Sequence, residues 1–130
     1  MSSVRTVERR RAARGQRTTL TPGTVLYRGE DPLVRLVVEK IAEAIRPTQI
    51  HVYGSRVTGG ATLESDVDVL ILLDGETSHR DIQLQVHRLF SSPAVALDVS
   101  VMGTGEFEEQ RGIANTLARE VHENGVLCYG

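Results

Sequence analysis

Apolar residues recur every three or four positions in three stretches of the chain, which is the spacing of one buried helix face. The first stretch begins at Asp31 and Pro32, a pair that suits an N-cap and a first helical position, and it ends before Pro47. The second stretch covers residues 78–90. The third is marked by Ile113, Leu117 and Val121. We therefore predict three amphipathic helices.

Four shorter stretches have the composition of β-strands. Gln49–Tyr53 ends at a glycine, Val67–Leu73 is apolar on both faces, and residues 95–101 alternate apolar and polar side chains. Val126–Tyr129 is predicted as a short final strand. A run that is apolar on both faces indicates a central strand that other elements cover. Helices and strands that alternate in this way predict one small α/β domain.

Length and charge indicate one domain that follows a basic N-terminal segment. A chain of 130 residues fits one domain, and 40% apolar residues suffice for one modest core. Residues 1–17 hold six arginines against one glutamate, whereas the rest of the chain is acidic. We expect a flexible Arg-rich tail over residues 1–24 and a folded domain over residues 25–130. The tail is interpreted either as a solvated segment or as an arm that contacts RNA or an acidic protein surface.

Several classes of protein are disfavoured. No apolar run reaches the roughly 20 residues that span a bilayer, and the basic N-terminus lacks the apolar stretch of a secretory signal. We therefore expect a cytoplasmic protein without a membrane partner. An acidic body does not favour nucleic-acid binding, although the tail leaves that question open. The single cysteine, Cys128, is interpreted as a buried residue of the last strand.

The first candidate site is the turn after the first predicted strand, at Gly54 and Ser55. Glycine allows a sharp turn and lets a ligand approach the backbone. If Ser55 opens a helix, its hydroxyl and the free N–H groups suit a phosphate, and Arg56 adds a charge-assisted contact. The alternative is a turn with no ligand.

The second candidate site consists of three aspartates. Asp66 and Asp68 stand two residues apart at the start of a hydrophobic strand, so both carboxylates lie on one face. Asp98 stands in the middle of a later strand and can join them if the two strands are neighbours. Like charges repel, and a shared Mg²⁺ or Mn²⁺ explains the arrangement. The alternative is that these acids are simply exposed to solvent.

The chain carries, in this order, Gly54-Ser55, then Ser65-Asp66-Val67-Asp68-Val69, then a later strand with Asp98. This pattern resembles the nucleotidyltransferase superfamily that includes DNA polymerase beta. Within it, the chain is similar to the minimal nucleotidyltransferase (MNT) domains of prokaryotes. The resemblance covers roughly residues 31–130 and includes the closing stretch, residues 118–129. It implies a small nucleotidyltransferase fold with a central mixed sheet flanked by helices.

The resemblance also implies residue roles. Gly54, Ser55, Arg56 and Ser65 are expected to bind a nucleoside triphosphate, ATP in the first instance. Asp66, Asp68 and Asp98 are expected to be the catalytic residues and to hold two Mg²⁺ ions, or Mn²⁺ in their place. Thr58 stands where many relatives carry a second basic residue, which removes one expected phosphate contact.

Minimal nucleotidyltransferases often accompany a small helical protein of the HEPN type, or another toxin, as the antitoxin of a two-gene module. The resemblance therefore implies transfer of a nucleoside monophosphate, AMP by expectation, to a hydroxyl on a cognate toxin. One alternative is a catalytically inert antitoxin that acts by binding its partner or a nucleotide. Another is transfer to a small molecule.

Overall fold

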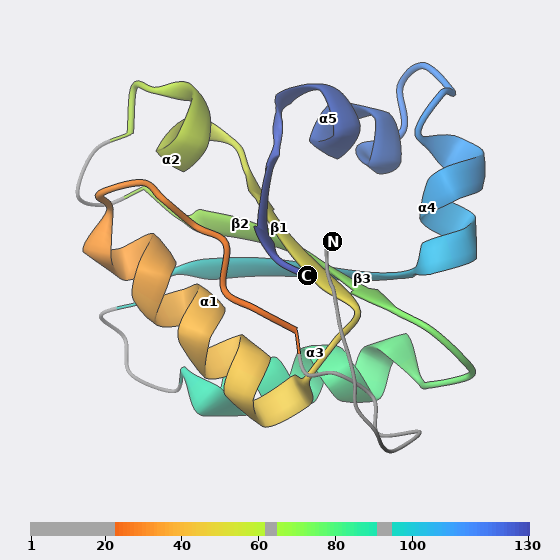
Figure 1. Ribbon diagram of the computed structural model, residues 1–130, viewed down its shortest axis with the longest axis horizontal. Helices are drawn as coiled ribbons and strands as arrows, with labels where there is room; N and C mark the ends of the chain where they lie inside the picture. The colour runs from red at the N-terminus through yellow and green to blue at the C-terminus, as the bar shows by residue number, and fades with distance from the viewer. Residues whose placement is uncertain (1–22, 62–64, 91–94) are drawn as a thin grey trace.

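The computed structural model describes residues 23–61, 65–90 and 95–130 as a sheet with helices on both sides (Figure 1). The described elements are α1 Pro32–Ile45, β1 Gln49–Tyr53, α2 Ser55–Thr58, β2 Val67–Leu73, α3 His79–Leu89, β3 Leu97–Gly103, α4 Thr104–Gln110, α5 Leu117–Asn124 and β4 Val126–Tyr129. The Arg-rich segment up to residue 22 lies outside the described residues, so the predicted tail stays a prediction.

The sheet is mixed and has the strand order β3-β2-β1-β4. β1 pairs antiparallel with both β2 and β4, whereas β2 and β3 are parallel and are joined through α3. A parallel pair needs such a crossover, because its second strand must start at the same edge as the first. The predicted α/β class with a mixed sheet flanked by helices is confirmed.

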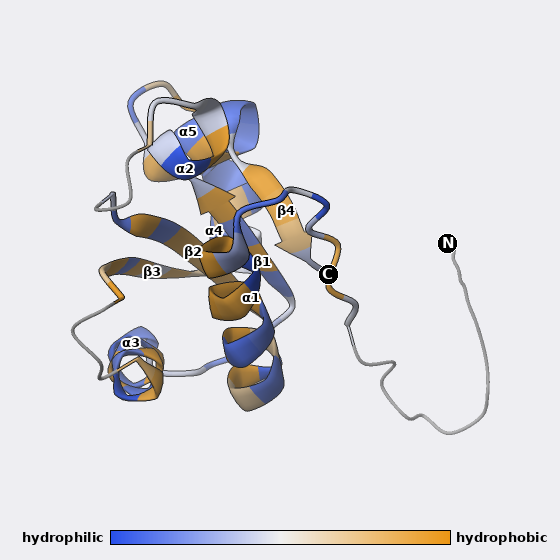
Figure 2. Ribbon diagram, turned by 90° about the vertical axis from the view of Figure 1, so that its left-hand side faces the viewer, coloured by the Kyte–Doolittle hydropathy of each residue, from blue (hydrophilic) through white to orange (hydrophobic). Residues whose placement is uncertain are grey.

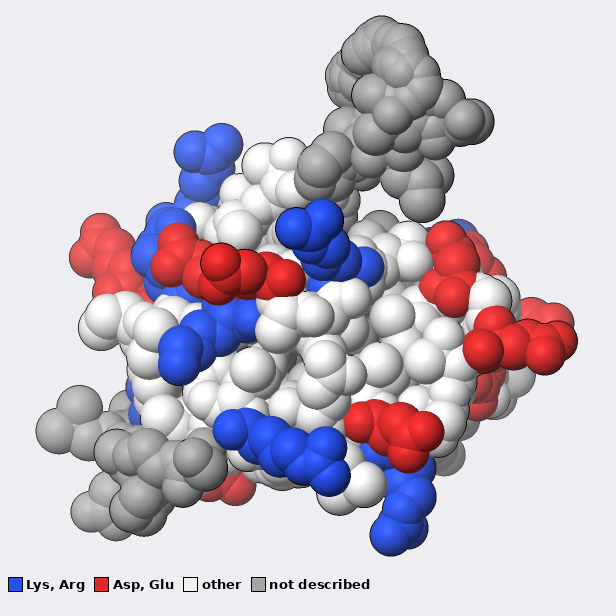
Figure 3. Space-filling view, turned by 90° about the horizontal axis from the view of Figure 1, so that it is seen from below, with Lys and Arg blue, Asp and Glu red and all other residues white. Residues whose placement is uncertain are grey.

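The helices α1 and α3 cover one face of the sheet and enclose the larger apolar cluster. On α1 the buried residues are Val34, Val37, Val38, Ile41 and Ala42. Both α1 and α3 are amphipathic, with apolar and polar residues on different sides of the helix (Figure 2). Seen from the side of α1 and α3, basic and acidic side chains surround an uncharged centre, so this face has no single sign of charge (Figure 3).

A second, smaller apolar cluster lies on the opposite face, under α4 and α5. It contains Leu70 and Leu72 of β2, Met102 of β3, Phe107 of α4 and Ala118 and Val121 of α5. Strand β2 therefore contributes buried side chains to both faces, as its uninterrupted apolar run predicts. On this face α4 packs on β2 and β3, and α5 packs on β1.

Two boundaries differ from the sequence-based expectation. Ile113 does not belong to the last helix and is 54% exposed, because the chain turns after α4 and α5 begins only at Leu117. The Thr116 side chain accepts a hydrogen bond from the Arg119 N–H at 3.1 Å and caps α5 there. The third predicted strand also begins later, at Leu97, and runs on to Gly103.

The chain before α1 covers the outer edge of β4. The Leu26 N–H donates to the Cys128 carbonyl at 2.8 Å, and the Thr24 N–H donates to the Gly130 carbonyl at 3.0 Å. Cys128 is fully buried in β4, as predicted. None of the helices in the described part of the chain combines the length and apolar character that crossing a bilayer requires.

Candidate active site

Three polar side chains form a row across the central strands. Asp68 of β2 is in register with Asp98 of the parallel strand β3 and with Tyr53 of the antiparallel strand β1. Neighbouring strands lie about 4.8 Å apart, and residues in register point to the same side. The register therefore brings Asp68 and Asp98 together, on the face that carries the smaller apolar cluster. Asp66 immediately precedes β2 and is exposed, as is Asp98.

The Gly54 turn lies directly against this row. Gly54 has φ 82° and ψ −162°, a conformation that is essentially restricted to glycine. A Cβ atom at this position would collide with the Asp68 carboxylate. The turn then starts α2, in which the N–H groups of Val57 and Thr58 both donate to the Gly54 carbonyl at 3.1 Å. Ser55 is half-buried beside it. The two candidate sites predicted from the sequence are therefore one site.

The charges of this site are crowded. Burial, together with the negative charges of Asp98 and Asp66, raises the pKa of the Asp68 carboxyl. Asp68 is half-buried, so water screens this repulsion less well than it would at an open surface. A cation bound beside Asp68 would relieve both effects.

Carboxylate oxygens are the ligands that Mg²⁺ and Mn²⁺ prefer, so the chemistry of the donor set fits a divalent metal. Over residues 23–61, 65–90 and 95–130, however, no three His, Cys, Asp or Glu side chains already converge on one point that could hold a metal ion. Mutual repulsion of the carboxylates favours such separation. The metal-binding role of Asp66, Asp68 and Asp98 stays a prediction.

Tyr53 belongs to the site, although the sequence pattern did not single it out. It is half-buried at the end of β1. Burial raises the pKa of Tyr53, and the nearby charges of Asp98, Asp68 and Glu120 act in the same direction. The available signal was its place next to Gly54, but only the strand register shows that it faces the aspartates.

Arg56 and Ser65 contact each other. The Arg56 Nε and Nη2 atoms donate to the Ser65 carbonyl oxygen at 3.1 and 2.9 Å, and Nη1 donates to Asp31 Oδ2 at 2.9 Å. The Arg56 side chain is only 7% exposed. The structure thus places the four residues predicted to bind nucleotide around one turn. It also gives Arg56 protein partners, and its role in phosphate binding stays a prediction.

Comparisons with known proteins agree with this fold. The nucleotidyltransferase domain family matches residues 34–128, which is most of the chain. No curated protein matches the chain. A crystal structure of a candidate nucleotidyltransferase from Sulfolobus solfataricus has a similar fold, with a TM-score of 0.50 and 24% sequence identity over 73% of this chain and 75% of that one. The family match includes the Gly54 turn and all three aspartates, and the chain therefore belongs to the nucleotidyltransferase domain family.

Proposed function

We propose that this protein transfers a nucleoside monophosphate, AMP from ATP, to a hydroxyl on a partner protein, and that it acts as the antitoxin of a toxin–antitoxin module. The observation that carries the enzymatic part is the contact between the Gly54 turn and the row formed by Asp68 and Asp98. A turn suited to phosphate next to paired carboxylates is the arrangement that nucleotidyl transfer requires. The partner and the antitoxin role rest on the resemblance to minimal nucleotidyltransferases.

Each residue has a part in the proposed reaction. Gly54 and Ser55 would hold the β- and γ-phosphates, Ser65 would add a contact to the nucleotide, and Asp66, Asp68 and Asp98 would hold Mg²⁺, which would supply positive charge to the triphosphate. Asp98 accepts the proton of the acceptor hydroxyl. The acceptor oxygen forms a bond to the α-phosphorus while the bond from that phosphorus to the bridging oxygen breaks, and pyrophosphate leaves. Positioning and neutralisation of charge supply most of the rate enhancement.

The exposure of the acids supports an acceptor that arrives on another macromolecule. Asp66 and Asp98 are both exposed, so a hydroxyl presented by a partner can reach the carboxylates from outside. A proton acceptor must come within hydrogen-bond reach of the hydroxyl that it deprotonates. In the proposed module, the cognate toxin supplies that hydroxyl.

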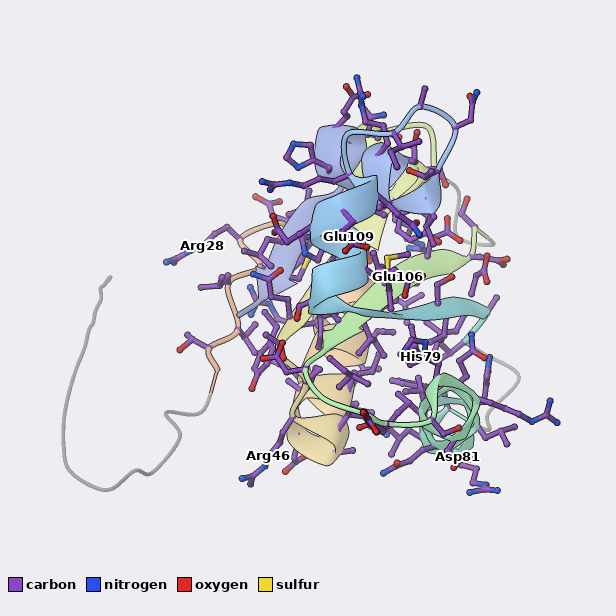
Figure 4. All side chains as sticks on the ribbon, turned by 90° about the vertical axis from the view of Figure 1, so that its right-hand side faces the viewer. Arg28, Arg46, His79, Asp81, Glu106 and Glu109 are labelled. Atoms are coloured by element: carbon purple, nitrogen blue, oxygen red, sulfur yellow. The ribbon has the colours of Figure 1, made fainter. Side chains whose placement is uncertain are left out.

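Label transfer tests the proposal. The purified protein, Mg²⁺ and α-labelled ATP are added to a lysate of the native host, in parallel with the Asp66→Asn/Asp68→Asn variant. The control variant is Glu106→Gln/Glu109→Gln, which also removes two negative charges. Both control residues lie on α4, which follows the end of β3 farthest from Asp98 (Figure 4). We expect a labelled protein band with the wild type and the control, and none with the aspartate variant.

Other results would correct specific parts of the proposal. Label on RNA or on a small molecule would keep the transferase and replace its acceptor. Mg²⁺-dependent binding of ATP without transfer to any acceptor would favour an inert antitoxin that acts by complex formation. If the wild type bound none of the four nucleoside triphosphates, the enzymatic proposal would be wrong.

A further inference from the structure

The backbone on both sides of Asp66, where the chain enters β2, is held by hydrogen bonds. On the side before Asp66, the Ser65 carbonyl accepts two hydrogen bonds from Arg56, at 3.1 and 2.9 Å. On the side after it, the Val67 N–H donates to the Ala96 carbonyl at 3.0 Å. Both peptide groups that flank Asp66 are therefore fixed, although its side chain is exposed.

Arg56 is itself fixed by the N-terminus of α1. Its Nη1 atom donates to Asp31 Oδ2 at 2.9 Å, and the side chains of the pair are 7% and 22% exposed. Asp31 Oδ1 accepts hydrogen bonds from the Leu33 and Val34 N–H groups at 3.0 and 3.4 Å, so the other oxygen of the same carboxylate caps α1. One carboxylate thus joins the helix start to the guanidinium.

The connected groups run from α1 through Asp31 and Arg56 to the Ser65 carbonyl and the backbone of Asp66. Little solvent reaches the pair, and the planar Arg56 guanidinium donates three hydrogen bonds, two to the Ser65 carbonyl and one to Asp31. Side chains that hold a metal ligand in place commonly change metal affinity by 10–100-fold when they are substituted. A ligand on an exposed loop depends on such support, because packing does not restrain it.

We propose that Arg56 and Asp31 are positioning residues that hold the backbone of Asp66 for metal binding, and that Arg56 acts through the Ser65 carbonyl and not as a phosphate ligand. This inference rests on the proposed function for its catalytic meaning. It makes Asp31, which lies 25 positions before Arg56 in the chain, part of the machinery of the site.

The test uses the full chain and the variants Asp31→Asn, Arg56→Lys and their combination. Asparagine still caps a helix but removes the carboxylate oxygen that Arg56 contacts. Lysine keeps the charge but cannot make the same set of hydrogen bonds. The control is Glu39→Gln, which also removes one acid of an ion pair on α1, at an exposed position (53%). If one of the two single variants does not fold, the other single variant is compared with the wild type and with Glu39→Gln.

The first readout is hydrogen exchange of the Val67 N–H without ligand, at matched global stability. We expect exchange about ten-fold faster in Asp31→Asn and Arg56→Lys, and unchanged in Glu39→Gln, because the strand entry opens locally. If both single variants exchange at the wild-type rate, the inference is overturned.

The second readout is binding of Mn²⁺ in the presence of a non-hydrolysable ATP analogue. We expect each single variant to weaken Mn²⁺ binding about ten-fold. The double variant should bind Mn²⁺ about as tightly as each single variant does, because the two residues act through one connection. A loss of nucleotide affinity in Arg56→Lys alone, with Asp31→Asn like the wild type, would instead identify a phosphate ligand. If the wild type binds neither nucleotide nor Mn²⁺, the proposed function fails, and the exchange of Val67 still decides the positioning role.

Discussion

The substitution Gly54→Ala tests whether the turn and the carboxylate row form one site. Gly54 has φ 82° and ψ −162°, and residues other than glycine pay of order 1–3 kcal/mol to adopt such a conformation. The added Cβ would also collide with the Asp68 carboxylate. Alanine therefore requires either a different turn or a displaced Asp68. We expect a loss of at least about 1–3 kcal/mol in the free energy of unfolding, together with loss of metal-dependent nucleotide binding.

Gly59→Ala is the matched control. Gly59 has φ 103° and ψ 165°, which lies in the same glycine-restricted region, but no described atom lies within 4 Å of a Cβ built there. The control therefore has the same kind of backbone strain without the collision. Urea unfolding measures the stability of both variants, and titration with a fluorescent ATP analogue and Mn²⁺ measures binding.

The reasoning predicts that the two variants separate in binding. Gly59→Ala should lose about 1–3 kcal/mol of stability and still bind the nucleotide with its metal. Gly54→Ala should lose binding even under conditions where it is fully folded. Wild-type binding by folded Gly54→Ala would show that the position of Asp68 under the turn does not matter for the site.

Four further predictions concern stability and reactivity. Because the pKa of Asp68 is raised by burial and by Asp98 and Asp66, its charged form destabilises the fold, so Asp68→Asn should unfold at higher urea at pH 7, and this gain should shrink in acid as the wild-type carboxyl protonates. Burial alone would raise the pKa of Asp31, but hydrogen bonds from Arg56 and from two backbone N–H groups lower it. The ionised Asp31 carboxylate should therefore stabilise the fold above pH 3.8, and this stabilisation should be lost as the pH falls through the pKa of Asp31 in the folded state. The difference in free energy of unfolding between wild type and Asp31→Asn should shrink over the same range of pH. Burial raises the pKa of the Cys128 thiol to about 11, so a thiol reagent at pH 8 should modify the protein only at the rate of unfolding, and rapid modification of the folded protein would contradict this. Ile41→Ala should cost about 2–5 kcal/mol because the side chain is fully buried, whereas Leu36→Ala on the exposed side of the same helix should cost little.

The sequence was informative where a short-range rule applies. Asp31 and Pro32 marked the start of α1, and the uninterrupted apolar run of Val67–Leu73 marked the central strand. These signals depend on capping and on burial of both strand faces, which neighbouring residues determine. Ile113 was misassigned because an apolar residue at helical spacing need not be buried, and the chain turns before α5 begins.

Some residues of the candidate site were also predictable from the sequence, and others were not. Gly54, Asp66, Asp68 and Asp98 were recognisable from their types and spacing, since a glycine turn and paired acids need special conditions. Tyr53 was not recognised, because its relation to Asp68 depends on the register of two strands. The partners of Arg56 were equally hidden, because Asp31 and Ser65 reach it from separate segments.

The sequence by itself determined the order of the four strands and of α1, α3 and α5, the acidic character of the folded part and the residue types that metal and phosphate chemistry would use, but it did not separate α4 from the helix that follows. Local periodicity and capping are properties of adjacent residues, so they can be read without the fold. Only the tertiary structure decided that Asp98 pairs with Asp68, that Gly54 lies against that pair, and that Arg56 contacts Ser65 and Asp31. These contacts join residues distant in the chain, and they follow from strand register and helix packing, which depend on how all the apolar surfaces are buried together.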